Sequence, residues 1–208
     1  MGGKLARRPG VIYNWAMIQS LPTPKRWTRD EWYRLAELGF FPEGCHTELI
    51  EGEILVMSPQ GPNHSRSMML GNEILTDFFR GTHMVRVQCP LTIDERTEPE
   101  PDFSIIGREE ALALRGKHPG TAELVIEISD SSLSYDRNEK ASLYARAGVP
   151  EYGILNLQKR SLELHRQPHQ DSELRFGWGY ASRTILGPED DFAPLAGADR
   201  KLRVGDFF

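Results

Sequence analysis

Apolar residues change their spacing several times along the chain, and these changes predict alternating helices and strands. A capping-box pattern at Thr28–Glu31 is followed by apolar residues at helical spacing, which predicts a short helix. Two short apolar runs around Gly52, within residues 48–57, predict a β-hairpin. From Asn63, which we expect to be the cap, apolar residues recur every three or four positions up to Phe79. The longest amphipathic helix is expected there.

The middle of the chain alternates between strand-like and helix-like patterns. Strands are predicted at 84–93 and 102–106, and the nearly continuous apolar run 124–128 is typical of a strand covered on both faces. A helix is predicted over 136–147 and another strand over 152–157. The resulting αβββαβ order implies an α/β fold, in which a mixed central sheet is flanked by helices.

The length of 208 residues fits one domain. We predict a single domain over 1–208, with a loosely ordered leader at 1–26 followed by an extra N-terminal helix. The core is expected over 45–160, and residues 161–208 are expected to form a C-terminal extension of short β segments.

Composition narrows the class of partner. Acidic residues outnumber basic ones by 30 to 25, which makes the net charge −5 with neutral histidines. Non-specific attraction to nucleic acid depends on lysine and arginine that neutralise phosphates. Binding to polyanions in general is therefore disfavoured, and any contact with nucleic acid must be local. The 39% of hydrophobic residues are sufficient for a packed interior and exclude wholesale disorder.

The chain has two cysteines, Cys45 and Cys89. Their separation fits neither a zinc site nor a disulfide framework. No stretch approaches the roughly 20 apolar residues that a membrane span requires. We therefore expect a cytoplasmic protein with reduced thiols and no membrane partner.

Two charged residues occupy positions that the patterns assign to the interior. Glu127 stands inside the most apolar strand, where an isolated carboxylate is costly to bury. Lys140 lies on the stripe of the next helix that faces the sheet. Taken singly, Glu127 is better explained by a structural arginine or by solvent, and Lys140 by an amine that reaches water. Because the helix directly follows the strand, however, both charges point to one place.

Asp102 is a third candidate, at the entry of a strand that becomes apolar immediately after it. By itself it could be an ordinary turn aspartate. If its strand neighbours that of Glu127, two carboxylates ~4 Å apart repel by ~4 kcal/mol at an effective dielectric of ~20. A divalent cation together with Lys140 would balance them. Oxygen ligands that leave positions for water suit Mg²⁺ or Mn²⁺.

Several short motifs occur together in this part of the chain. They are Pro101-Asp102, Glu127-Ile128-Ser129, Tyr135-Asp136, Glu139-Lys140, Tyr144, residues 147–152, residues 48–53, and residues 57–59 with His64. As a set they resemble the Uma-type putative restriction endonucleases, a branch of the PD-(D/E)XK nuclease superfamily. The resemblance covers roughly residues 45–160.

The resemblance implies a restriction-endonuclease-like core and Mg²⁺-dependent cleavage of DNA phosphodiesters. Asp102 and Glu127 match the metal-binding carboxylates, and we expect a backbone carbonyl near Ile128 to complete the metal site. Lys140 matches a lysine that usually stands two residues after the glutamate, where this chain has Ser129. We expect Lys140 to orient or deprotonate the attacking water.

Glu48 and His64 match further recurrent positions of the family. Glu48 would hold the metal through water, and His64 would contact a phosphate or relay a proton. Taken singly, Glu48 is better explained as a solvated hairpin residue, and His64 fits a helix-cap histidine equally well. The chain departs from the family at Asp130, where proline is usual, and at Gly153, where an aromatic residue is common.

DNA is the predicted partner, and a homodimer would present two sites to the two strands of a duplex. The apolar end Phe207-Phe208 is expected to be exposed and to support self-association. Four basic residues are expected near DNA: Arg108, Arg115, Lys117 and Arg137.

Two other function classes remain open. A nuclease-like binding or assembly module that does not cleave is favoured by the acidic charge. The three charged residues Asp102, Glu127 and Lys140 disfavour it, because apolar residues in their place would stabilise a purely structural site equally well. A two-carboxylate glycosidase has the required residue types, but the sequence shows no cleft of aromatic residues.

Overall fold

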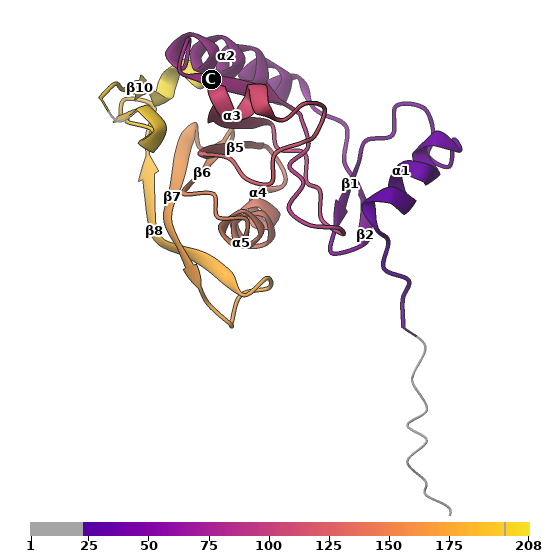
Figure 1. Ribbon diagram of the computed structural model, residues 1–208. Coiled ribbons are helices and arrows are strands. Elements are labelled where there is room, and N and C mark those ends of the chain that lie inside the picture. The colour runs from indigo at the N-terminus through magenta and orange to yellow at the C-terminus, as the bar shows by residue number, and fades with distance from the viewer. Residues whose placement is uncertain (1–22, 198) are drawn as a thin grey trace, which may run out of the picture.

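A six-stranded sheet forms the centre of the computed structural model, which describes residues 23–197 and 199–208 (Figure 1). The strand order is β3-β4-β5-β6-β7-β8. β5 and β6 run parallel, and all other neighbours in this sheet are antiparallel. The predicted mixed sheet with αβββαβ order is therefore confirmed. Most of the predicted leader, 1–22, lies outside the described residues.

The helices and strands have the following bounds: α1 Arg29–Glu37, β1 Thr47–Ile50, β2 Glu53–Val56, α2 Pro62–Phe78, β3 His83–Val87, β4 Phe103–Gly107, α3 Arg108–Ala113, β5 Leu124–Ser129, α4 Leu133–Tyr135, η1 Asp136–Lys140, α5 Ala141–Arg146, β6 Glu151–Asn156, β7 Ser161–Gln170, β8 Trp178–Leu186, β9 Asp191–Phe192, η2 Leu195–Gly197, β10 Leu202–Arg203 and η3 Val204–Phe207. None of the described helices is long and apolar enough to cross a membrane.

Helices cover both faces of the sheet and enclose two apolar clusters. Helix α2 lies over one face, and the α4–η1–α5 segment covers the other (Figure 1). Ile126 of β5 belongs to the cluster beneath α2, whereas its neighbour Val125 belongs to the cluster beneath α5. This alternation is the one expected for a strand covered on both faces.

Helix α2 begins one residue before the predicted cap. Pro62 is its first residue and Gly61 is the N-cap, so the prediction that Asn63 caps the helix was wrong. Proline is favoured at this position because its φ is already helical and it has no amide hydrogen to satisfy. A Cβ atom at Gly71 would lie only 2.8 Å from the Phe103 ring, which shows how closely α2 packs on β4.

Strand β3 ends at Val87, well before the predicted residue 93. Gln88 has a left-handed φ of 46°, and Pro90 has no amide hydrogen for a ladder. The following residues connect β3 to β4 and carry Glu98, which bridges to Leu49 of β1. The amide of Glu98 donates to the Leu49 carbonyl at 2.7 Å, which ties the β1–β2 hairpin to the entry of β4.

The expected helix after β5 exists, but it is not a regular α-helix. It starts with α4, continues as the π-helical segment η1 and ends as α5. Asp136 and Lys140, the first and last residues of η1, are both buried. π-helical segments are rare, and those that do occur are often found at functional sites. Hydrophobic periodicity does not predict them.

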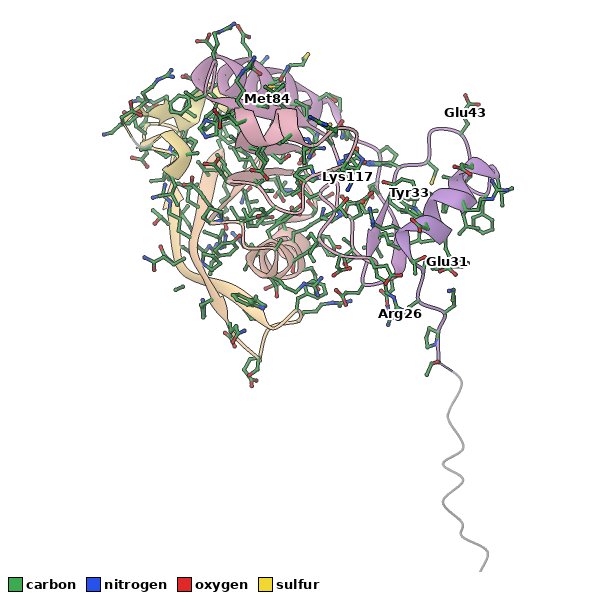
Figure 2. All side chains as sticks on the ribbon, viewed as in Figure 1. Arg26, Glu31, Tyr33, Glu43, Met84 and Lys117 are labelled. Atoms are coloured by element: carbon green, nitrogen blue, oxygen red, sulfur yellow. The ribbon has the colours of Figure 1, made fainter. Side chains whose placement is uncertain are left out.

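The N-terminal helix α1 has the predicted capping box, with reciprocal bonds between Thr28 and Glu31. The amide of Trp27 donates to the Gly52 carbonyl at 2.9 Å, so the start of α1 lies against the β1–β2 turn. Tyr33 extends from α1 toward the rest of the chain, where its hydroxyl donates to Glu98 (Figure 2).

The C-terminal part contributes more to the fold than short β segments. β7 and β8 are strands of the central sheet itself, and β9 pairs with β10. Phe207 is fully buried in the cluster beneath α2, and Phe208 packs against that cluster. The expectation of an exposed apolar tail was therefore wrong, because these rings fill the space between α2 and the sheet.

Candidate active site

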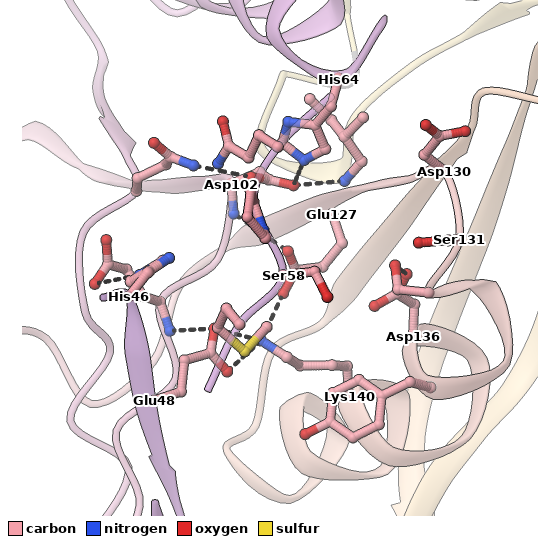
Figure 3. A pocket seen from close by; sticks show the side chains of 18 of the residues that line it. His46, Glu48, Ser58, His64, Asp102, Glu127, Asp130, Ser131, Asp136 and Lys140 are labelled. Carbon is pink, nitrogen blue, oxygen red and sulfur yellow. Dashed lines mark hydrogen bonds and ion pairs between the residues drawn. The ribbon is translucent and has the colours of Figure 1, made fainter. Parts of the chain in front are cut away.

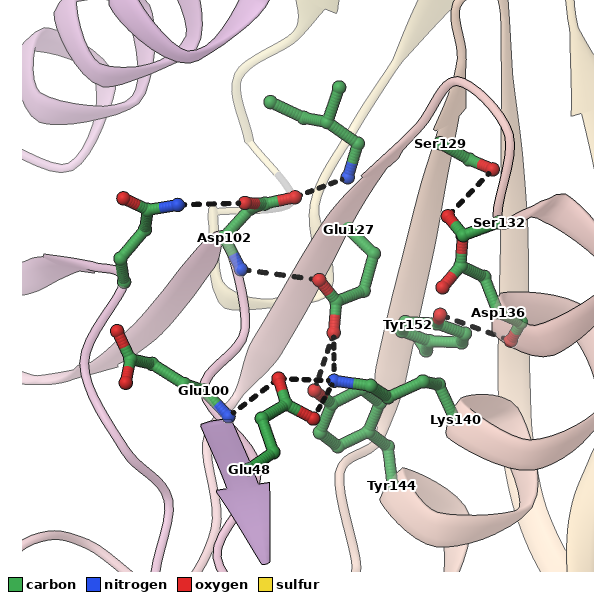
Figure 4. Close-up of polar contacts among 12 residues, drawn as sticks. Glu48, Glu100, Asp102, Glu127, Ser129, Ser132, Asp136, Lys140, Tyr144 and Tyr152 are labelled. Carbon is green, nitrogen blue, oxygen red and sulfur yellow. Dashed lines mark hydrogen bonds and ion pairs between the residues drawn. The ribbon is translucent and has the colours of Figure 1, made fainter. Parts of the chain in front are cut away.

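Asp102 and Glu127 lie side by side because β4 and β5 are neighbours. Phe103 pairs with Ile126, which places Asp102, just before β4, next to Glu127. The Asp102 amide donates to Oε2 of Glu127 at 3.3 Å (Figure 4). The Ile128 amide donates to Oδ2 of Asp102 at 2.8 Å. The predicted pair of carboxylates is thus brought together, and the backbone of Ile128 borders it.

Lys140 reaches the same place from η1 on the neighbouring helical layer. Its Nζ lies 2.8 Å from Oε1 and 2.8 Å from Oε2 of Glu48, and 3.2 Å from Oε1 of Glu127. The lysine is only 3% exposed, so its amine is enclosed between the two glutamates. The explanation that its amine reaches water does not hold.

Glu48 is a buried residue of β1, so it is not the solvated hairpin residue that the sequence favours when it is considered singly. It is 1% exposed, and besides Lys140 it accepts a bond from the Glu100 amide at 3.2 Å. The hairpin therefore contributes a carboxylate to the site.

Tyr144 is a member of the site that the sequence analysis did not assign a role. Its hydroxyl donates to Oε1 of Glu127 at 2.6 Å, and the residue is fully buried. Its position one helical turn after Lys140, on the stripe that faces the sheet, was the available signal. Oε1 of Glu127 thus bonds to Tyr144 and Lys140, whereas Oε2 faces Asp102.

His64 lies in the first turn of α2, and its Nε2 is 3.1 Å from Oδ2 of Asp102 (Figure 3). The Gln88 side chain donates to Oδ1 of the same carboxylate at 3.4 Å. Burial lowers the pKa of His64, but the hydrogen bond and the charge of Asp102 outweigh it, and the net pKa is raised. His64 is therefore a direct neighbour of the carboxylate pair.

Burial and charge shift the proton equilibria of the central residues. Burial raises the pKa of Glu127 to about 8, although the Lys140 charge opposes the shift. Burial would lower the pKa of Lys140, but Glu127 and Glu48 outweigh it and raise the pKa above its ordinary value. Lys140 is therefore a positive charge throughout the physiological pH range.

These residues line a pocket of about 410 Å³. Its acidic lining residues are Glu48, Glu100, Asp102, Glu127, Asp130 and Asp136. Lys140 is the one lysine or arginine among its described lining residues. Figure 3 shows Asp130 and Asp136 on the opposite side of the pocket from Glu48. Burial raises the pKa of Asp136, whose carboxylate accepts a bond from Ser132 at 2.6 Å.

The donor set fits a cation that prefers oxygen and retains water. Asp102 and Glu127 supply two adjacent carboxylates in a pocket with an excess of negative charge. From the described part of the chain, Oε2 of Glu127 accepts a single, long bond, so it has capacity for another partner. Within residues 23–197 and 199–208, no group of three or more His, Cys, Asp or Glu side chains is placed so that it could hold a metal ion. A site of two carboxylates completed by water is typical of Mg²⁺.

The basic residues expected near DNA lie in different surroundings. Arg108 follows β4, while Asp102 precedes it, so strand length alone separates their backbones by roughly 20 Å. Arg137 forms an ion pair with buried Glu163. Arg108 therefore lies far from the carboxylate pair along β4, and Arg137 is already paired with Glu163.

The mixed sheet with a carboxylate pair at adjacent strands is the architecture of a restriction-endonuclease-like nuclease. A family model named Uma2 and described as "Putative restriction endonuclease" matches residues 29–194, and the chain belongs to this family. The family and the fold together indicate a nuclease, a class of hydrolase. The predicted family is confirmed.

A solved structure with the same fold is described as a putative nuclease belonging to DUF820 from Anabaena variabilis ATCC 29413. It is 15% identical in sequence, with a TM-score of 0.63 over 87% of this chain and 97% of that chain. No curated protein matches the chain.

Proposed function

We propose that this protein is a Mg²⁺-dependent endonuclease that hydrolyses DNA phosphodiester bonds. The observation that carries the proposal is the convergence of Asp102, Glu127 and Lys140, from three separate segments of the chain, at one acidic pocket. A purely structural core has no need to enclose such a cluster, because apolar residues of similar volume are often as stable.

Asp102 and Glu127 would hold Mg²⁺ or Mn²⁺. When bound, this ion would polarise a phosphate oxygen and lower the pKa of a coordinated water. The Ile128 and Asp102 amides hold the two carboxylates in register, and Tyr144 holds the far oxygen of Glu127. These bonds would orient the ligand oxygens before substrate arrives.

Lys140 would supply a fixed positive charge beside the reacting phosphate. Because its pKa is raised by two glutamates, charge balance is a better assignment for it than proton abstraction. In hydrolysis, water adds to phosphorus, one phosphorus–oxygen ester bond breaks, and charge accumulates on the phosphoryl oxygens. A buried ammonium group near these oxygens stabilises that charge.

Glu48 and His64 would act on the two sides of the cluster. Glu48 forms an ion pair with the Lys140 amine, so its role would be to position the lysine. His64 contacts Asp102 and would orient that carboxylate or move a proton at Nε2.

The decisive experiment measures nicking of supercoiled plasmid with Mg²⁺, Mn²⁺ or EDTA. Wild type should nick with either metal and should be inactive with EDTA, whereas Asp102→Asn and Lys140→Met should be inactive in all three. Circular dichroism and thermal melting of each variant establish that it is folded. Equal nicking by wild type and both variants would overturn the proposal.

The non-cleaving binding or assembly module has one observation in its favour. Lys140 already neutralises part of the charge of Glu48 and Glu127 without any metal. Titration with Mn²⁺ separates the two functions. If the protein is a nuclease, the wild type should bind the ion at this site and Asp102→Asn should not. A cytoplasmic location and a homodimer remain predictions of the sequence.

A further inference from the structure

A second hollow, of about 280 Å³, opens next to the catalytic pocket. Asp130 lines both. On α2, His64 lines the catalytic pocket, whereas Arg66 lines the second hollow. Arg160, in the turn between β6 and β7, lines it as well. The two hollows are therefore neighbours that share one wall.

The relative position of the two hollows is held by the turn that carries Arg160. The Gln158 side chain in this turn donates to the Asp130 carbonyl at 2.8 Å. Asp130 directly follows β5, the strand of Glu127. The second hollow is thus anchored to the same strand end that forms the catalytic pocket.

Arg66 and Arg160 are exposed and have no carboxylate partner among the described residues. Other arginines of the sheet and its helices differ: Arg137 and Arg166, for example, form ion pairs with buried glutamates. The Arg160 guanidinium lies 5.2 Å from the centre of the Phe208 ring, which supports it from one side. The guanidinium N–H groups of both arginines remain available to an anion.

The charges of the two hollows are opposite. The catalytic pocket has six acidic lining residues and one lysine. The second hollow is lined by the side chains of Arg66 and Arg160 and by one acidic side chain, that of Asp130. A phosphate group would be repelled by the first without a cation, but attracted by the second directly.

Arg160 also adopts a backbone conformation that is unfavourable for its residue type. Its φ is 47°, in the left-handed region that Gly and Asn occupy more easily. Turn propensity therefore does not account for an arginine here.

We propose that Arg66 and Arg160 form a phosphate subsite that binds the nucleotide next to the one whose phosphodiester is cleaved. The proposal rests on the proposed function and specifies its substrate as a continuous polynucleotide strand that extends from the catalytic pocket over Asp130 into the second hollow. Contacts with two neighbouring phosphates would let an acidic protein hold DNA without a general basic surface.

The test measures binding of a fluorescein-labelled DNA oligonucleotide in EDTA, by anisotropy, at several salt concentrations. The double variant Arg66→Gln/Arg160→Asn should raise Kd by about 10-fold or more and reduce the salt dependence by about one phosphate contact. Asparagine tolerates the left-handed φ, so the turn should retain or gain stability, which thermal melting measures.

A matched control removes the same charge elsewhere. Arg34→Gln/Arg96→Gln changes two exposed arginines that line neither hollow, and Kd should change less than about 2-fold. Equal weakening by both double variants, or absence of DNA binding by wild type, would overturn the subsite. If Arg66→Gln/Arg160→Asn weakens binding but wild type never nicks DNA, the subsite stands and the proposed cleavage fails.

Discussion

The amine of Lys140 lies 2.8 Å from the carboxylate of Glu48, although 92 residues separate them in the chain. Both side chains are almost completely buried, and Glu127 is the second partner of the lysine. The β1–β2 hairpin and the π-helical segment are thus joined through a charged contact at the edge of the proposed active site.

Removal of Lys140 should therefore destabilise the protein strongly. Lys140→Met leaves Glu48 and Glu127 buried without their cation, and breaking a buried pair of this kind costs about 3–5 kcal/mol. The double variant Glu48→Gln/Lys140→Met should recover part of this loss, because one of the stranded charges is gone. Urea unfolding measures both values.

Lys25→Met is the matched control for the loss of a lysine ion pair. Lys25 and Glu31 pair at the surface, where water screens them, so the free energy of unfolding should change little. If Lys140→Met is no more destabilising than Lys25→Met, the buried pair is not a strong structural contact.

Metal binding should release a proton from Glu127 near neutral pH. Burial raises the pKa of Glu127, so without metal this carboxyl keeps a proton to a higher pH than an ordinary glutamate, whereas a metal ligand must be ionised. The apparent affinity for Mn²⁺ should therefore rise as the pH increases toward 8. Calorimetry in two buffers of different ionisation enthalpy measures the released proton, and Glu127→Gln should abolish the release.

The hydroxyl of Tyr144 should affect activity more than its ring. Tyr144→Phe keeps the ring packing but removes the 2.6 Å bond to Glu127, and loss of such an outer contact typically lowers metal affinity or activity by about 10- to 100-fold. Tyr180→Phe is the control, because its hydroxyl bonds to the Val149 carbonyl at 2.9 Å, away from the carboxylates. Similar metal affinity for the two variants would contradict this assignment.

His165 should make the protein less stable in mild acid. Burial lowers the pKa of His165 to about 4, and the charge of Arg183 adds to the shift. The native state therefore keeps this histidine neutral while the unfolded chain takes up a proton below about pH 6.5. Stability from this group is fully present above pH 6.5 and is lost as the pH falls toward 4, by about 3 kcal/mol.

The measurement is the free energy of unfolding from pH 7 to pH 4 for wild type, His165→Gln and His169→Gln. His165→Gln should show a smaller loss than wild type. His169 is exposed on the same strand, and its replacement should leave the pH dependence unchanged. Identical curves for all three proteins would show that His165 is not the group responsible.

Much of the fold and part of the site follow from local patterns. The capping box predicted α1, the apolar run predicted β5, and alternation along β5 placed Val125 and Ile126 on opposite faces. Glu127 and Lys140 were detectable because charge in an apolar pattern requires a partner, and that requirement is a property of the sequence itself.

The sequence by itself therefore determined most of the helices and strands from α1 to β6 and which charged residues need partners, because periodicity and burial cost are local. Only the tertiary structure decided which residues those partners are. Strand pairing set Asp102 beside Glu127, the π segment and hairpin enclosed Lys140 with Glu48, and packing buried Phe207. These contacts join segments far apart in the chain, and their geometry depends on how the layers pack.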